Sequence, residues 1–110
     1  MEYRKPTPIG KVEAAKVFEA HNLEEICSTL VRVAFYEPDY EWAQDRCLEF
    51  CEHFDDEVKG VAVTCLGHIA RIHRRLDMEK VKPVLDTLMR DPIIAGRAAD
   101  ALSDIEIFIR

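Results

Sequence analysis

The sequence predicts an all-α domain, a short right-handed α-solenoid of about three antiparallel helix pairs. Two observations carry this prediction. Residues 55–73 place apolar side chains on one face at helical spacing. Residues 91–105 repeat that pattern after a shift of 36 positions, and a helical repeat of this length is typical of a solenoid. The aligned pairs are Asp55 and Asp91, Val58 and Ile94, Gly60 and Gly96, Ala62 and Ala98, Leu66 and Leu102, and Ile69 and Ile105.

A first helix pair is expected within residues 9–36, after an extended or loosely attached segment of residues 1–8 that contains two prolines. Its first helix should run from about residue 9 to residue 20. The second should cover residues 22–36, with Asn22 as the cap and Glu25 completing a capping box. This second helix is apolar over much of its circumference, so we expect neighbours on more than one side.

The second pair is predicted within residues 39–75. Asp39 should cap a helix over residues 40–54, with its acidic side chains turned largely away from the core. The expected inward residues of that helix are Tyr40, Ala43, Cys47, Phe50, Cys51 and Phe54. The next helix, residues 57–74, should turn in Val58, Val61, Ala62, Cys65, Leu66, Ile69 and Ile72.

The third pair is predicted within residues 77–109, which completes a single domain over residues 1–110. Asp77 opens it, and Pro83 allows two alternatives: a helix that starts near Lys82 after a short turn, or a helix that is bent at the proline. Asp91 and Pro92 should begin the last helix, residues 93–109, with the proline in its first turn.

The motif Asp-x-x-Val-Lys-x-x-Ala-x-x-Cys-Leu-Gly-x-Ile, which starts at Asp55, resembles the second helix of a HEAT repeat. A looser copy starts at Asp91, with Ala95 in place of the family's basic residue and Ser103 in place of its glycine. The resemblance covers roughly residues 39–109. It implies a HEAT-like superhelix with residues 22–36, 57–74 and 93–109 on the concave side, and a binding role of unspecified kind.

Composition narrows the class of protein. The chain has 110 residues, of which 48% are hydrophobic and 33% charged, as expected for one folded domain. Residues 61–70 lie in the longest uncharged run, which is too short to cross a bilayer, and the N-terminal residues have no apolar signal core. We therefore expect a cytoplasmic protein. A net charge of −6 argues against nucleic acid as a direct partner and is compatible with a basic protein as the partner.

The sequence shows no catalytic constellation, phosphate-binding loop or nucleophile elbow, so we expect a non-enzymatic protein without cofactor or metal. Its four cysteines, Cys27, Cys47, Cys51 and Cys65, occupy apolar helical positions and are expected to be reduced and buried. A metal site of Cys47 and Cys51 with His68 or His73, or a redox role, stays open as an alternative. We expect His68 and His73 themselves to be structural.

Charge is segregated along the chain and defines a first candidate surface. Residues 37–57 hold nine acids and one base, a net −8, whereas residues 59–90 hold seven bases and three acids, a net +4. This is either an ordinary solvated face or an acidic surface that docks a basic protein. The candidate residues, which we call the acidic face, are Glu41, Asp45, Glu49, Glu52 and Asp56.

Two further surfaces are candidates. The outward side of residues 57–74 should show Gly60, Val63, Thr64, Gly67, Arg71 and Arg74, and its two glycines indicate a close approach, either by a neighbouring helix or by a partner in the concave groove. The candidate concave contacts are Thr64, Gly67, Arg71, Arg74, Asp100 and Asp104. At the C-terminus, Ile107 and Phe108 are candidates for self-association or for packing on the previous helix.

The function that these features favour is a protein-binding module. The resemblance adds a sharper hypothesis, because small HEAT-like proteins occur among bacterial toxin-immunity proteins: the chain neutralises a basic toxin, such as a nuclease, by direct binding. The alternative is a self-associating HEAT-like scaffold or adaptor, a homodimer through the C-terminal helix. An enzyme or cofactor chaperone is a third hypothesis, which lacks the paired His-Glu motifs that metal-binding HEAT-like hydroxylases carry.

Overall fold

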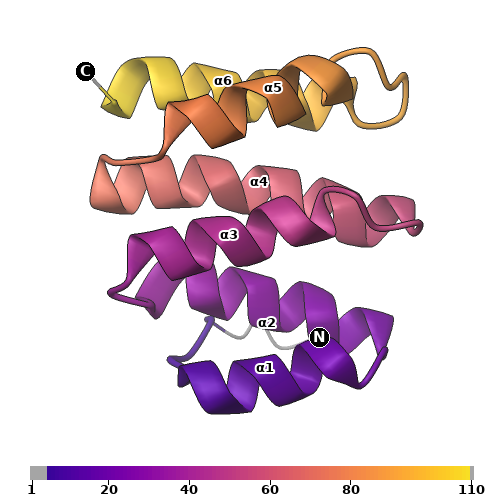
Figure 1. Ribbon diagram of the computed structural model, residues 1–110, viewed down its shortest axis with the longest axis vertical. Coiled ribbons are helices and arrows are strands. Elements are labelled where there is room, and N and C mark those ends of the chain that lie inside the picture. The colour runs from indigo at the N-terminus through magenta and orange to yellow at the C-terminus, as the bar shows by residue number, and fades with distance from the viewer. Residues whose placement is uncertain (1–4, 110) are drawn as a thin grey trace.

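The computed structural model describes residues 5–109, which form six α-helices and no strand. The helices are α1 (Lys11–Glu19), α2 (Leu23–Tyr36), α3 (Tyr40–Phe50), α4 (Asp56–His73), α5 (Met78–Leu88) and α6 (Ala95–Phe108). Figure 1 shows them stacked in chain order from α1 to α6, with α1, α3 and α5 in front of α2, α4 and α6. None of these helices is long and apolar enough to cross a membrane. The predicted all-α class is confirmed.

Side chains just before four of the helices accept hydrogen bonds from backbone N–H groups in the first helical turn, which have no partner within the helix. Asn22 Oδ1 accepts from Glu25 N at 3.0 Å, and Asp55 Oδ1 accepts from Val58 N at 3.0 Å. Asp39 and Asp77 cap α3 and α5 in the same way. Asn22 and Asp39 are the caps that the sequence indicated, and Asp77 opens α5 as expected, so these helix starts follow from local chemistry.

α4 is the helix on which the core is built, because it packs against α2, α3 and α6. Its predicted inward residues Val58, Ala62 and Leu66 are fully buried, as are Cys65 and Ile69. Each fully buried aliphatic side chain of this kind contributes about 1.5–3 kcal/mol through removal from water. Ile72 was also predicted to be buried but is 43% exposed. It lies in the last turn of α4, where cover by neighbouring helices ends.

The side of α4 opposite its predicted inward face is partly covered by the chain itself. Gly60, Val63 and Gly67 are buried, whereas Thr64, Arg71 and Arg74 are exposed. A Cβ placed at Gly67 would lie 2.8 Å from Asp104 Oδ2 and 3.4 Å from Cα of Ala101, and one at Gly60 would meet the Arg97 guanidinium. The glycines therefore allow α6 to approach, which is the neighbouring-helix alternative.

The third helix is shorter than predicted. It ends at Phe50, and residues 51–55 form a link to α4. The prediction that Phe54 points into the core is wrong, since its side chain is 85% exposed. The cause is the next helix: Asp55 takes an extended conformation to cap α4, so the chain has to leave the helix before it.

The last helix starts later than predicted. α6 begins at Ala95, and Pro92 stands in a turn rather than in the first helical turn. Asp91 Oδ1 closes this turn by accepting from Ile93 N at 2.9 Å and from Ile94 N at 3.4 Å. In α5, by contrast, the helix begins at Met78 and contains Pro83, so a start near Lys82 is wrong.

The N-terminal segment is attached to α2. Arg32 donates from Nε to the Thr7 carbonyl and from Nη2 to the Pro8 carbonyl, both at 2.9 Å. Residues 5–10 are not helical, and Ile9 among them is buried. Residues 1–4, which belong to the same predicted segment, lie outside the described residues.

Gln44 provides a test of the contact between α3 and the residue that caps α5. It is fully buried, and its Oε1 accepts from Asp77 N at 2.6 Å. Gln44→Met should lower the free energy of unfolding by about 1–3 kcal/mol, because the Asp77 N–H loses its partner. Urea unfolding measures this change. Glu41→Met, an exposed position on the same helix, is the control and should stay within about 0.5 kcal/mol of wild type; equal effects of both variants would contradict this role of Gln44.

Candidate functional site

The five residues of the acidic face are spread from the start of α3 to the start of α4. Glu41 lies in the first turn of α3 and Asp56 is the first residue of α4, and these two helices begin at opposite ends of the molecule (Figure 1). Glu41, Glu49, Glu52 and Asp56 are exposed, whereas Asp45 is half-buried. The five carboxylates therefore do not form one continuous patch.

Two of these carboxylates have basic neighbours. Asp45 Oδ1 lies 3.5 Å from Lys80 Nζ, and Glu49 Oε2 lies 3.2 Å from Arg46 Nε. The Arg46–Glu49 contact is close enough for an ion pair but is not aligned as a hydrogen bond. Such exposed pairs reduce the local charge and add little stability, typically about 0–1 kcal/mol.

Glu49 and Glu52 line a groove of about 380 Å³ between α1 and the end of α3. Its other lining residues are Ala15, Phe18, Glu19, Arg46, Phe50 and His53. A second groove of about 390 Å³ lies between the starts of α2 and α4, lined by Leu23, Glu24, Cys27, Asp55 and Glu57. Both grooves thus combine carboxylates with an apolar floor.

The expected concave contacts lie on α4 and α6. Thr64, Arg71 and Arg74 on α4 are exposed, as is Asp100 on α6, and Asp104 is half-buried. Gly67, the sixth of this set, is covered by α6 and has no exposed surface to present. The arginines also serve the fold: Arg71 Nη2 lies 3.1 Å from His68 Nδ1, and the Arg74 guanidinium lies 5.7 Å from the centre of the Phe108 ring.

His68 sits between these polar residues and α2. Its ring centre lies 4.8 Å from that of Phe35. Burial lowers the pKa of His68 below its ordinary value, the nearby Arg71 charge lowers it further, and Asp104 opposes the shift. The neutral imidazole is therefore the form that the folded protein favours.

The C-terminal apolar residues are separated by the fold. Ile105 is buried and Ile109 packs against the core. Ile107 is 54% exposed, and Phe108 is half-buried beside Arg74. Only Ile107 among them presents a large apolar side chain to solvent.

The cysteines are mostly internal. Cys47, Cys51 and Cys65 are buried, Cys27 is half-buried, and all four are free thiols. A hydrogen bond with Cys65, together with burial, raises the pKa of Cys47, and burial is the main cause that raises the pKa of Cys51. Within residues 5–109, no group of three or more His, Cys, Asp or Glu side chains is placed to hold a metal ion.

Sequence reasoning missed Phe54 as a surface residue. The signal was present, because an aspartate that caps one helix directly after another helix requires a non-helical link before it. The preceding pattern, with Phe50 and Cys51 at buried helical positions, instead favoured one continuous helix. The two grooves beside this link depend on how α1–α4 pack, which the sequence pattern does not specify.

The fold and the exposed grooves place the chain in the class of all-helical proteins made of short, successively packed helices. A chain in the crystal structure of a CDI complex from Cupriavidus taiwanensis LMG 19424 is 37% identical to it, with a TM-score of 0.87. The match covers 98% of this chain and 97% of that chain. The chain therefore belongs to the same family as that protein. No protein-family model and no curated protein sequence matches it.

Acid should destabilise the fold partly through His68. In the unfolded chain its pKa is about 6.5, and in the folded chain it is lower. The unfolded state therefore binds more protons as the pH falls through 6.5, so stability is fully present above that pH and declines below it. His68→Gln should reduce the loss of unfolding free energy between pH 7.5 and pH 5.5, measured by urea titration.

The control for this prediction is Thr64→Ala, an exposed residue one turn earlier on α4. It should keep the wild-type difference between the two pH values. A His68→Gln variant with the full wild-type difference would show that His68 does not contribute.

Proposed function

We propose that this chain is an immunity protein that neutralises a toxin by direct, non-enzymatic binding. The observation that carries the proposal is the 37% identity, over nearly the whole of both chains, with a chain of a CDI complex. Such a complex joins a toxin to its immunity protein. The net charge of −6 favours the immunity side of the pair, because toxins that act on nucleic acid need basic surfaces.

A basic toxin, such as a nuclease, is the partner that the charge distribution supports. Carboxylates on an exposed surface raise the association rate with a basic protein and select against acidic ones. Glu41, Glu49, Glu52 and Asp56 are exposed and available for this role. The cytoplasm is the compartment in which we expect the two proteins to meet. The exposed concave residues Thr64, Arg71, Arg74 and Asp100 remain a second contact surface in this proposal.

We also propose that the stack is a right-handed solenoid of HEAT type, with antiparallel pairs at residues 9–36, 39–75 and 77–109. The contacts of α4 with both α2 and α6 support this arrangement, since each pair then packs on the next. The repeat between residues 55–69 and 91–105 supports it as well.

The direct test starts from the native host. The tagged chain is captured there, and the protein that binds it in stoichiometric amount is identified and expressed alone in a neutral bacterial host. We expect that protein to arrest growth and co-expression of this chain to restore growth to within about twofold of the toxin-free rate. Calorimetry should give a nanomolar complex, about −12 kcal/mol, as is common for specific protein pairs.

Two results would contradict the proposal. One is that no stoichiometric partner is recovered under low-salt conditions, where electrostatic attraction is strongest. The other is that the recovered partner does not impair growth when it is expressed alone.

A self-associating scaffold is the alternative function, and the 54% exposure of Ile107 is the observation that favours it. An exposed isoleucine near a chain end can form a small apolar contact between two copies. In that case, sedimentation at high protein concentration should show a dimer for wild type and a monomer for Ile107→Asp. A monomeric wild-type protein excludes the alternative, and Val12→Asp, at another exposed apolar position, is the control.

A further inference from the structure

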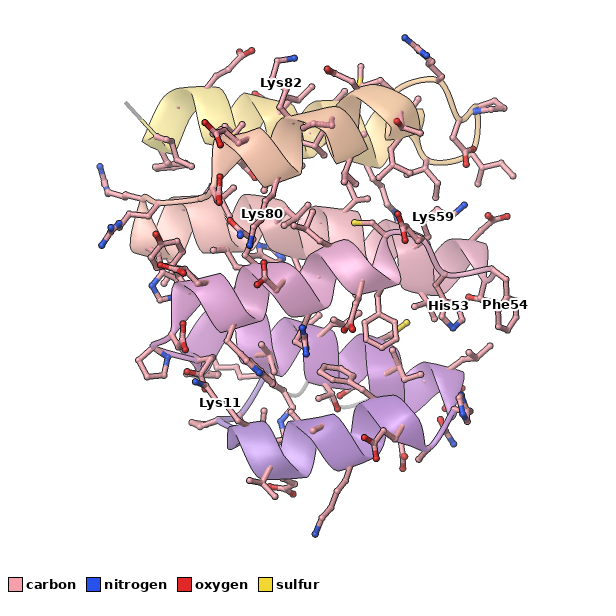
Figure 2. All side chains as sticks on the ribbon, viewed as in Figure 1. Lys11, His53, Phe54, Lys59, Lys80 and Lys82 are labelled. Atoms are coloured by element: carbon pink, nitrogen blue, oxygen red, sulfur yellow. The ribbon has the colours of Figure 1, made fainter. Side chains whose placement is uncertain are left out.

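The α3–α4 link, residues 51–55, presents an aromatic ring to solvent. Phe54 is 85% exposed, more than any other large apolar residue in the described part of the chain. Figure 2 shows His53 and Phe54 together at one end of the molecule, where the link between α3 and α4 turns. Removing a phenylalanine ring from water is favourable, so a ring exposed to this degree is available to bind a partner.

A series of ring–ring contacts connects Phe54 to the partly buried rings of Phe18 and Phe50. The ring centres of Phe18 and Phe50 lie 5.0 Å apart, those of Phe50 and His53 5.9 Å apart, and those of His53 and Phe54 4.4 Å apart. His53 and Phe54 are stacked, with 26° between the ring planes. These spacings are typical of favourable aromatic pairs. The series leads from packed rings of α1 and α3 to the exposed Phe54.

Hydrogen bonds hold the backbone of the link. Glu52 N donates to the Glu49 carbonyl and His53 N to the Phe50 carbonyl, both at 3.2 Å. Asp55 N donates to His53 Nδ1 at 3.0 Å, which fixes the ring that stacks on Phe54. Cys51 at the base of the link is buried. These bonds order the backbone of the link and the His53 ring, so less conformational freedom of the link is lost on binding, which favours affinity.

The residues on either side of Phe54 in the chain line two acidic grooves. His53 lines the first groove and Asp55 lines the second, so Phe54 stands between them in the chain. Six carboxylates line the two grooves, whereas Arg46, close to Glu49, is their one lysine or arginine. The carboxylates are Glu19, Glu49 and Glu52 in the first groove and Glu24, Asp55 and Glu57 in the second.

We propose that Phe54 is the central anchor for the toxin, which inserts the ring into an apolar pocket and places lysine or arginine side chains in the two grooves beside it. This inference rests on the proposed function and names the surface through which it acts. The stems of such side chains would cover Leu23, Phe18 and Phe50, while their charged ends would meet the carboxylates. Interface energy is commonly concentrated in an anchor of this kind, surrounded by a polar rim.

Charge distinguishes this site from the other exposed apolar positions. Val12 is 73% exposed and Ile93 is 67% exposed, but neither is next in the chain to a residue that lines one of the two acidic grooves, whereas Phe54 lies between His53 and Asp55. The acid beside Ile93 is Asp91, which lies 3.7 Å from Lys59. Glu57 lies 3.5 Å from Arg97 and Glu49 lies 3.2 Å from Arg46, which leaves more carboxylates than basic groups at the two grooves. The position of Phe54 therefore combines an exposed ring, a hydrogen-bonded link and a net negative charge, which suit a basic partner.

The test measures the affinity of the toxin captured with the wild-type chain, by calorimetry and by growth protection. Phe54→Ala should raise the dissociation constant by about 30-fold or more, the size of effect that defines a central interface residue. Phe54→Trp should restore binding to within about fivefold, since an aromatic ring is kept. Val12→Ala is the matched control and should bind as wild type does. Circular dichroism should show all four proteins folded.

A second arm tests the grooves. The double variant Glu19→Lys and Glu52→Lys should slow association at least tenfold at low salt, whereas Glu106→Lys, an exposed acid on α6, should leave it within about twofold. If the wild-type chain binds the toxin and the Phe54→Ala variant binds it with the same affinity, this inference is wrong and the proposed function stands. Absence of any binding by the wild-type chain would overturn both.

Discussion

The structure depends on the burial of α4 on several sides at once. Because α2, α3 and α6 all pack against it, this one helix joins the N-terminal and C-terminal halves of the chain. Its inward face carries large apolar residues such as Leu66 and Ile69, and a second face carries glycines. Gly60 and Gly67 each cost about 1 kcal/mol of helix propensity, and the close packing of α6 over them explains why that cost is tolerated.

The residues that precede α4 and α6 determine which neighbouring side chains are exposed. Asp55 fixes the start of α4, so the preceding residues leave α3 early and form a link that exposes Phe54. Asp91 precedes α6, where it closes a turn that contains Pro92. Asp55 thus fixes where α4 begins and leaves Phe54 facing solvent, whereas Asp91 closes the turn before α6 without capping that helix.

The all-helical class, the capping residues and the buried face of α4 could be predicted from the sequence, because periodicity and capping chemistry act locally. The surface could be predicted less well. The sequence left open whether Gly67 meets a neighbouring helix or a partner, because a single helix pattern does not reveal that Asp104 and Ala101 cover it. Glu41 and Asp56 are close in sequence but lie at opposite ends of the fold, since α3 and α4 start there. Phe54 was misplaced because an apolar residue at helical spacing looks buried until the helix end is known.

The chain combines a family relationship to a protein of a CDI complex with an exposed aromatic residue whose neighbours in the chain line acidic grooves. Hydrogen–deuterium exchange on the chain, free and bound to the captured toxin, tests this combination most directly. We expect the backbone amides of residues 23–27 and 51–57, around the two grooves, to exchange more slowly when the toxin is bound, and those of α5 to exchange at an unchanged rate. Protection confined to α5 and α6, with no change in residues 51–57, would contradict it.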